Sequence, residues 1–159
     1  MTQQSTADST GPVRPGRRSG QASEFTIIFP LKPGGAERTR ELLRHLDRSA
    51  REMIETLDDS RMVFFDNDTR MLFASTFDGD WDSYIDDFAS KTPDQLDTIF
   101  GEAEGYPGPR DPGIKDYIVK YQVEADEFYS AYPDATVKQI RKGQRVLKAW
   151  EELLDTAAE

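Results

Sequence analysis

Tyrosines and nearby charged groups are the side chains best suited to do chemistry in this chain of 159 residues. A tyrosine in a cavity can donate a proton or hold an enolate oxygen, and a carboxylate can accept a proton. A cation beside them can stabilise negative charge as it develops. Each tyrosine also fits a structural role, in which its buried hydroxyl has a hydrogen-bond partner. The candidates are Tyr129 and Tyr132 as acids, Asp87 or Asp126 as the base, and Arg61 or Lys115 as the electrostatic clamp.

The stretch from Arg70 to Phe88 would place polar groups beside apolar ones. It reads as a strand that ends at Phe77, a turn at Asp78-Gly79, and an amphipathic helix that Asp80 caps. A loop of four glycines and three prolines between Gly101 and Gly113 could close over such a site as a lid. A cavity of this lining suits an apolar or aromatic ligand better than a sugar or a nucleotide. The residues predicted to bind substrate are Phe73, Ser75, Phe77, Trp81, Tyr84, Tyr106 and Lys115.

Several chemistries are excluded by composition and motif. The chain has no cysteine and one histidine, which removes thiolate nucleophiles, disulfides, iron–sulfur clusters and multi-histidine metal centres. Asp78, Asp80 and Asp82 have the spacing of a calcium loop, but Ser83 and Ala89 stand where that loop needs glycine and glutamate. Helix capping explains these aspartates, and Pro33-Gly34-Gly35 lacks the lysine of a phosphate loop. We predict no metal site.

Net charge restricts the partners of the protein. The chain carries 30 acidic and 20 basic residues, a formal net charge of −10. Such a surface disfavours binding to nucleic acid and to anionic membranes, and no apolar run approaches the roughly 20 residues of a membrane span. Residues 1–22 have almost nothing to bury, so we predict a disordered tail there and one domain over residues 23–159. The expected location is cytoplasmic.

Hydrophobic periodicity predicts a regular order of elements. Residues 24–29, 62–65, 71–77 and 125–131 read as strands, with a hairpin turn between the second and the third. Amphipathic helices are predicted over residues 36–57, from Asp80, from Thr92-Pro93, over 114–122, and from Pro133-Asp134 to near the end. In the last helix one face gathers most of the apolar residues, namely Val137, Ile140, Gly143, Leu147, Trp150 and Leu154, with Val146 and Leu153 at its margin.

This order predicts an α+β fold of ferredoxin-like type. The order βαββαβ gives an antiparallel four-stranded sheet with helices on one side, here with a helical insert and a C-terminal helix. The first strand and the hairpin are apolar on both faces, so the face without helices needs a second cover. Two copies stacked face to face, as in a dimeric α+β barrel, would supply it. The alternative is that the closing helix covers this face.

The blocks Met71 to Phe88 and Phe128 to Pro133, followed by Thr136-Val137, resemble the dimeric α+β barrel superfamily. They look most like the ferredoxin-like domains of bacterial proteins related to dye-decolorising peroxidases. This resemblance implies a homodimer, but it leaves the activity open among haem enzymes, cofactor-free monooxygenases, isomerases, lyases and ligand binders. Haem-binding relatives hold iron through a histidine, and His45 lies about 120° from the apolar face of its predicted helix. Haem is therefore disfavoured.

From these features we expect a homodimeric enzyme without a cofactor, acting on a small, hydrophobic, oxygenated molecule by acid–base chemistry. The class would be lyase, isomerase or oxygenase. The first alternative is a non-catalytic ligand-binding or scaffolding dimer, because none of the catalytic motifs considered is complete. The second alternative is haem-dependent, peroxidase-like oxidation, which the resemblance implies. The substrate, the reaction and the sheet face that lines the cavity do not follow from the sequence.

Overall fold

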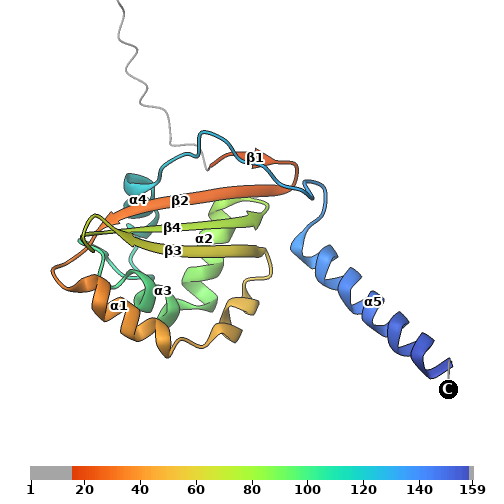
Figure 1. Cartoon of the computed structure of the whole chain (residues 1–159). Coiled ribbons are helices and arrows are strands. Elements are labelled where there is room, and N and C mark those ends of the chain that lie inside the picture. Colours follow the sequence, from red (N-terminus) through yellow and green to blue (C-terminus); the bar gives the residue numbers. More distant parts are fainter. Residues whose placement is uncertain (1–15, 158–159) are drawn as a thin grey trace, which may run out of the picture.

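Two long neighbouring strands joined by a tight hairpin form one side of the sheet. In the computed structural model, which describes residues 16–157, these strands are β3 (Leu57–Phe65), which is the edge strand, and β4 (Arg70–Asp78) (Figure 1). β4 also pairs with β2 (Ala22–Pro30), and the short β1 (Arg18–Ser19) pairs with the start of β2. All pairs are antiparallel, and the strand order is β1-β2-β4-β3. The fold is therefore α+β, with an open four-stranded antiparallel sheet.

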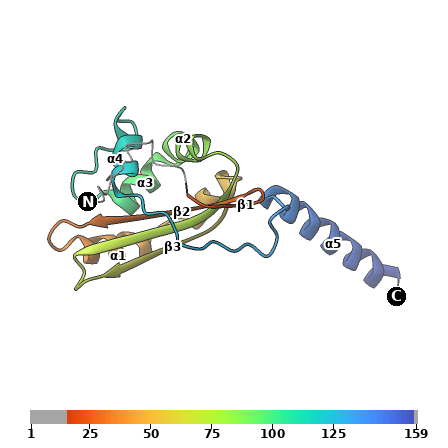
Figure 2. The same ribbon diagram turned by 90° about the horizontal axis from the view of Figure 1, so that it is seen from above.

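Helices cover one side of this sheet, as predicted. Figure 2 shows α2 (Trp81–Lys91), α3 (Pro93–Phe100) and α4 (Ile114–Tyr121) together on that side. Asp80 caps α2 as expected, because its carboxylate accepts a hydrogen bond from the amide of Ser83. Pro93 lies in the first turn of α3, also as expected, whereas the Thr92 hydroxyl donates to the carbonyl of Phe88 in the preceding helix.

The helix predicted over residues 36–57 is wrong in its length. The structure has α1 (Gly35–Arg44), then the 3-10 helix η1 (Arg48–Met53), and β3 already begins at Leu57. Asp47 caps η1, because its carboxylate accepts a hydrogen bond from the amide of Ser49. This bond offers the backbone an alternative to a continuous helix. Tertiary pairing also overrides the periodicity, since Leu57 pairs with Phe77 in the sheet.

The strand predicted over residues 125–131 is also wrong. The backbone pairing of this part of the chain with β2 is limited to a single bridge between Gln122 and Ile27 and a hydrogen bond from the Val123 amide to the Thr26 carbonyl. Beyond it come Glu124, Asp126 and Glu127, whose charges disfavour a strand that packs on a core. The start of β2 pairs at the same edge with β1, which falls within residues 1–22, the segment predicted to be a disordered tail. Residues 1–15 lie outside the described part of the chain.

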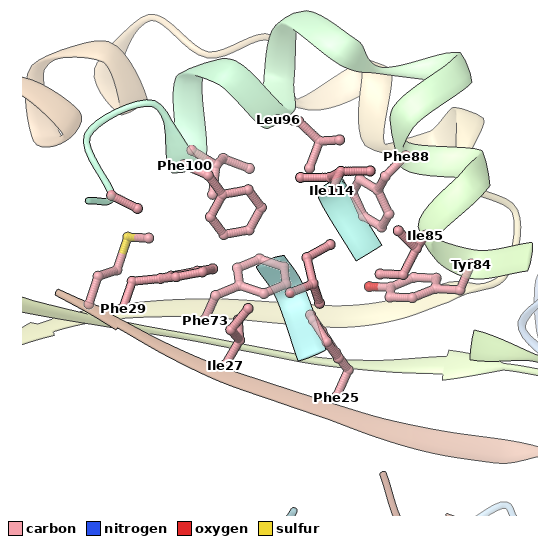
Figure 3. Close-up of a cluster of buried hydrophobic side chains, with 14 of the residues drawn as sticks. Phe25, Ile27, Phe29, Phe73, Tyr84, Ile85, Phe88, Leu96, Phe100 and Ile114 are labelled. Carbon is pink, nitrogen blue, oxygen red and sulfur yellow. The ribbon is translucent and has the colours of Figure 1, made fainter. Parts of the chain in front are cut away.

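The two faces of the sheet differ in how well the chain covers them. On the helix side, aromatic residues of β2 and β4 pack against aromatic residues of α2 and α3 (Figure 3). On the other side, Ile28, Leu72 and Val63 stand in one row across β2, β4 and β3. Ile28 and Leu72 are half-buried and Val63 is exposed. We call this second side the open face.

The closing helix α5 (Val137–Ala157) projects beyond the end of the sheet (Figures 1 and 2). It begins three residues after Asp134, because a turn at Pro133-Asp134 comes before it, closed by a hydrogen bond from the Ala135 amide to the Tyr132 carbonyl. The Gln21 amide donates a hydrogen bond to the Pro133 carbonyl and so holds this turn. Its apolar stripe is largely exposed, so α5 leaves the open face of its own sheet uncovered. No helix in the described range is both long enough and apolar enough to cross a membrane.

Candidate functional site

The residues predicted to form a site fall into two groups on opposite faces of the sheet, and some belong to neither group. Phe73, Ser75 and Phe77 point to the helix side of β4, where they meet Trp81 and Tyr84 of α2. Arg61 and Tyr129 lie together on the open face. Tyr106 lies with the helix-side group, whereas Asp87, Asp126, Lys115 and Tyr132 belong to neither group. The structure therefore does not bring the proposed acid, base and clamp into one site.

The helix-side cluster is closely packed. The rings of Phe77 and Tyr84 stack at 4.0 Å between centroids with 5° between their planes. Ser75 Oγ and Tyr84 Oη share a hydrogen bond of 2.6 Å, which satisfies both buried hydroxyls. Phe73 meets Phe25 and Phe100 edge to face. These contacts position the cluster as core rather than as an open binding pocket.

A cavity inside this cluster holds only about 30 Å³. Its walls include Phe73, Tyr84 and Tyr106, and all its exposed lining is apolar. A space of this size holds about one water molecule, and an apolar cavity of that size stays dry. A substrate larger than a water molecule does not fit this cavity.

Proton transfer by the buried tyrosines is disfavoured by their surroundings. Burial raises the pKa of Tyr84, and burial followed by the nearby Asp97 carboxylate raises the pKa of Tyr106. The Tyr106 hydroxyl and the Trp81 indole N–H are buried without a hydrogen-bond partner in the described chain. Both tyrosines therefore stay protonated at neutral pH, where they can donate hydrogen bonds but cannot act as bases.

A groove of about 260 Å³ lies on the open face, and it is the second place where predicted residues meet. Its floor is formed by the open side of the sheet, where Arg61 lies beside Ala74 and Thr76. The chain segment from Ala125 to Tyr129 forms a wall. Arg61 is exposed and lies 3.4 Å from Asp59, measured from guanidinium nitrogen to carboxylate oxygen. A solvent-accessible cation and a phenol, that of Tyr129, which is 78% exposed, thus share one mostly polar groove.

Glu24 fixes the wall of this groove. Its carboxylate is buried, and it accepts hydrogen bonds from the Arg17 amide at 3.1 Å, the Thr26 hydroxyl at 3.0 Å and the Ala125 amide at 3.2 Å. Charge-assisted bonds of this kind are about twice as strong as neutral ones. They tie the segment after α4 and the start of the described chain to β2. The groove therefore has a defined shape in a single chain.

The other predicted site residues have partners elsewhere. Asp87 pairs with Lys91 along α2 at 2.9 Å. Lys115 bridges Asp82 and Asp86 at 2.9 and 2.8 Å, which joins α4 to α2. Because α2 and α4 lie on the helix side, these groups are separated from the groove by the sheet. Tyr132 is 70% exposed.

The motifs weighed for metal and anion binding have structural roles. Asp80 caps α2, Asp78 accepts a hydrogen bond from the Val137 amide at 2.6 Å, and Asp82 pairs with Lys115. Within residues 16–157, no three carboxylates or histidines come together as a metal site would require. His45 is exposed beside Glu41, with 3.4 Å between Nε2 and Oε1. Gly34 adopts the left-handed conformation before α1, where it makes a turn.

Sequence reasoning missed several groove residues, chiefly Asp59, Glu127, Thr26 and Thr76. Strand alternation contains the signal for the two threonines, because Thr26 shares its face with Ile28, and Thr76 shares its face with Leu72 and Ala74. No local signal places Glu127 over that face. Its position depends on the path of the chain after α4.

Comparison with known proteins adds no assignment. No protein-family model matches this chain, and no curated protein matches it.

Proposed function

We propose that this protein binds a small, hydrophobic, oxygenated molecule in the groove on the open face. The observation that carries the proposal is the joint presence of Arg61 and Tyr129 in that groove, above Ala74. A guanidinium and a phenol can both hydrogen-bond to a carboxylate, phenolate or enolate oxygen. Ala74, Ala125 and Phe128 are the apolar part of a mostly polar lining, and an aromatic or aliphatic body would pack on them. The expected ligand is thus a small apolar acid or an enolisable carbonyl compound.

We further propose that the domain is ferredoxin-like. The segment around Gln122 and Val123 runs antiparallel beside β2, where the last strand of that fold would lie. In that interpretation it is a remnant of the fourth strand, which β1 supplements along the rest of the edge. The order of the other elements, from β2 through α1, β3 and β4 to α2, already follows the pattern.

A homodimer would complete the groove. Ile28, Leu72 and Val63 form an apolar row on the open face beside it, and half-exposed rows of this kind are typical of protein interfaces. A second copy stacked on this face, as in a dimeric α+β barrel, would exclude water from the groove and strengthen the contact between Arg61 and an anionic ligand.

Catalysis in the same groove is a second candidate function. The groove also holds the carboxylates of Glu127 and Asp59, which could accept a proton while Tyr129 donates one. This chemistry would need no cofactor. Glu127 or Asp59 takes the role predicted for Asp87, which lies on α2 on the other side of the sheet. Tyr132 has no role in this scheme. Haem remains disfavoured, because His45 lies at the end of α1 and outside the residues that line the groove.

The binding proposal is tested by a matched pair of cation variants. Benzoate and its uncharged amide serve as probes, and binding is measured by calorimetry on the full chain. We expect benzoate to bind more tightly than the amide, and Arg61→Gln to weaken benzoate binding about tenfold, since a charge-assisted contact contributes about 1.5 kcal/mol. Lys115→Gln removes a cation outside the groove and should leave binding unchanged. Equal binding by Arg61→Gln and the unmodified chain would show that the proposed site is wrong.

Tyr129→Phe separates binding from catalysis. If Tyr129 only holds the ligand, this change lowers affinity alone. If it donates a proton, turnover of an enolisable substrate falls about 100-fold or more, with little change in affinity. Turnover that survives both Tyr129→Phe and Glu127→Gln contradicts the catalytic candidate.

A further inference from the structure

Helix α5 presents an apolar stripe that has no partner within residues 16–157 of its own chain. The stripe residues Val146, Leu147, Trp150, Leu153 and Leu154 are between 50% and 61% exposed. Only Val137, at the very start of the helix, is buried. So large a set of exposed apolar side chains on one helix marks an interaction surface.

The start of α5 is held by hydrogen bonds that fix its first turn. The Val137 amide donates to the carboxylate of Asp78 at 2.6 Å, at the end of β4. The Thr136 amide donates to the Gln139 side chain at 2.9 Å, and the Gln139 amide donates to the Thr136 hydroxyl at 3.2 Å. This capping box fixes the direction of the first turn. The bond to Asp78 joins the first residue of α5 to the end of β4, at the edge of the body from which the helix projects.

The spacing of the stripe is that of a paired helix. Ile140, Gly143, Leu147, Trp150, Leu154 and Ala157 alternate at intervals of three and four residues. This is a heptad pattern over about 27 Å of helix, and such a pattern keeps one seam facing a partner helix. Val146 and Leu153 border the seam on one side and widen it.

Charge along α5 favours an antiparallel partner of the same sequence. Residues 137–148 contain five lysines and arginines and no acidic residue, whereas residues 149–157 contain three acidic residues and no basic one. Two antiparallel copies place the basic half of each beside the acidic half of the other. A parallel pair would place like charges together.

Side-chain size agrees with the same register. When the seam segments 140–157 of two antiparallel copies overlap fully, Gly143 of one helix faces Leu154 of the other, Ile140 faces Ala157, and Leu147 faces Trp150. Each of the first two pairs matches a small residue with a large one. Gly143 is otherwise unexplained, because a glycine inside a helix is destabilising by about 1 kcal/mol relative to alanine and nothing in the described chain lies within 4 Å of its added Cβ.

We propose that α5 pairs with α5 of a second copy of this chain, in an antiparallel two-fold arrangement. This pairing is a different form of homodimer from the stacking of open faces proposed above, and it does not depend on ligand binding by Arg61. The contact is small for a specific interface, so we expect a dissociation constant on the order of micromolar. An anionic membrane fits the surface less well. Residues 16–136 contain 25 acidic and 14 basic residues, a net of −11, which would be repelled from it.

Sedimentation of the full chain from about 1 to 100 µM tests the pairing through two matched variants. Leu147→Gln with Leu154→Gln removes apolar groups from the seam and should raise the dissociation constant at least 30-fold. Lys148→Gln with Asp155→Gln makes equal changes on the opposite side and should leave it unchanged, at the same net charge. A dimer that survives the seam variant but dissociates with Val63→Lys is held by the open faces, and overturns the α5 pairing. A wild-type chain that stays monomeric at 100 µM overturns both forms of dimer, while benzoate binding still tests Arg61.

Gly143→Leu distinguishes a second copy from a membrane. In the helix pair the new side chain collides with Leu154 of the partner, so the dimer should weaken at least tenfold. Binding to vesicles of anionic phospholipid would instead tighten, because the change adds apolar surface. Tighter vesicle binding with an unchanged dimer constant overturns the proposal.

Orientation is tested by disulfide formation, which is simple in a chain without cysteine. Gly143→Cys with Leu154→Cys should give a covalent dimer on oxidation, since these positions face each other only in the antiparallel register. Within one helix they are about 16 Å apart and cannot bridge. Gly143→Cys alone should remain uncross-linked. Efficient cross-linking by the single variant would show a parallel pair and contradict the proposal.

Discussion

Helices α2 and α5 are both amphipathic, yet the apolar face of α2 is buried and that of α5 is exposed. The four apolar residues of α2, Trp81, Tyr84, Ile85 and Phe88, are at most 8% exposed, because the sheet lies directly beneath them. The large apolar residues in the second half of α5 are at least 50% exposed. Periodicity therefore identifies which face of a helix is apolar, and the connection to the sheet decides whether the same chain covers it. α2 follows β4 after a two-residue turn, whereas α5 is directed away at its first residue.

The largest expected difference between the two helices is in the free energy of unfolding. Phe77 is fully buried against Tyr84 of α2, so Phe77→Ala should lower that free energy by about 3–5 kcal/mol. Trp150→Ala on α5 should change it by less than about 0.5 kcal/mol when measured below micromolar concentration, where the chain is monomeric. Urea denaturation followed by circular dichroism measures both. A large loss from Trp150→Ala would mean that α5 packs on its own body.

The hydrogen bond between Ser75 and Tyr84 tests how completely the α2 side is closed. Tyr84→Phe leaves the Ser75 hydroxyl buried without its partner, which should be destabilising by about 1–3 kcal/mol. The double variant Tyr84→Phe with Ser75→Ala removes both hydroxyls and should recover most of that loss. A double-mutant cycle in urea measures the coupling. Additive single effects would mean that water reaches this hydroxyl pair.

Loss of the helix caps should separate a global effect from a local one. Asp80→Ala removes the cap of α2 and should lower the stability of the whole domain by about 1 kcal/mol, because α2 unfolds only with the core. Thr136→Ala removes the cap of α5 and should only fray that helix. Hydrogen exchange resolves the two, since Thr136→Ala should speed exchange in residues 137–145 alone. Faster exchange throughout the domain would show that α5 and the body unfold together.

The same contrast explains what the sequence predicted and what it missed. The α2 side was predictable because its cap, its periodicity and its neighbouring strand are consecutive in the chain, so local signals and tertiary contacts agree. The strand predicted over residues 125–131 failed because its position depends on contacts with residues about 100 positions earlier, such as Glu24 with Ala125. The residues of the predicted site lie apart for the same reason. Asp87 and Tyr129 were chosen by residue type, but the loops that connect the strands and helices decide on which side of the sheet each one lies.

Asp78 joins the two regions, and its charge gives the smallest expected effect. Burial raises the pKa of Asp78, outweighing the hydrogen bond from the Val137 amide, and the neighbouring Asp58 raises it further. A carboxyl whose pKa is higher in the folded state contributes full stability below the unfolded value of about 3.9, and this contribution is lost as the pH rises through the folded value. Asp78→Asn keeps an oxygen that can accept the Val137 hydrogen bond and removes the partly buried charge.

The melting temperature of Asp78→Asn should therefore equal that of the unmodified chain near pH 3.5, and exceed it by up to about 2 °C at pH 7. Thermal melts across that range, with Asp134→Asn as an exposed control, measure the difference. If the variant were instead less stable at pH 7, attraction between the Asp78 carboxylate and the start of α5 would outweigh the cost of burying it. The direction of α5 would then depend on that charge, and the helix should become free to approach its own sheet below about pH 4.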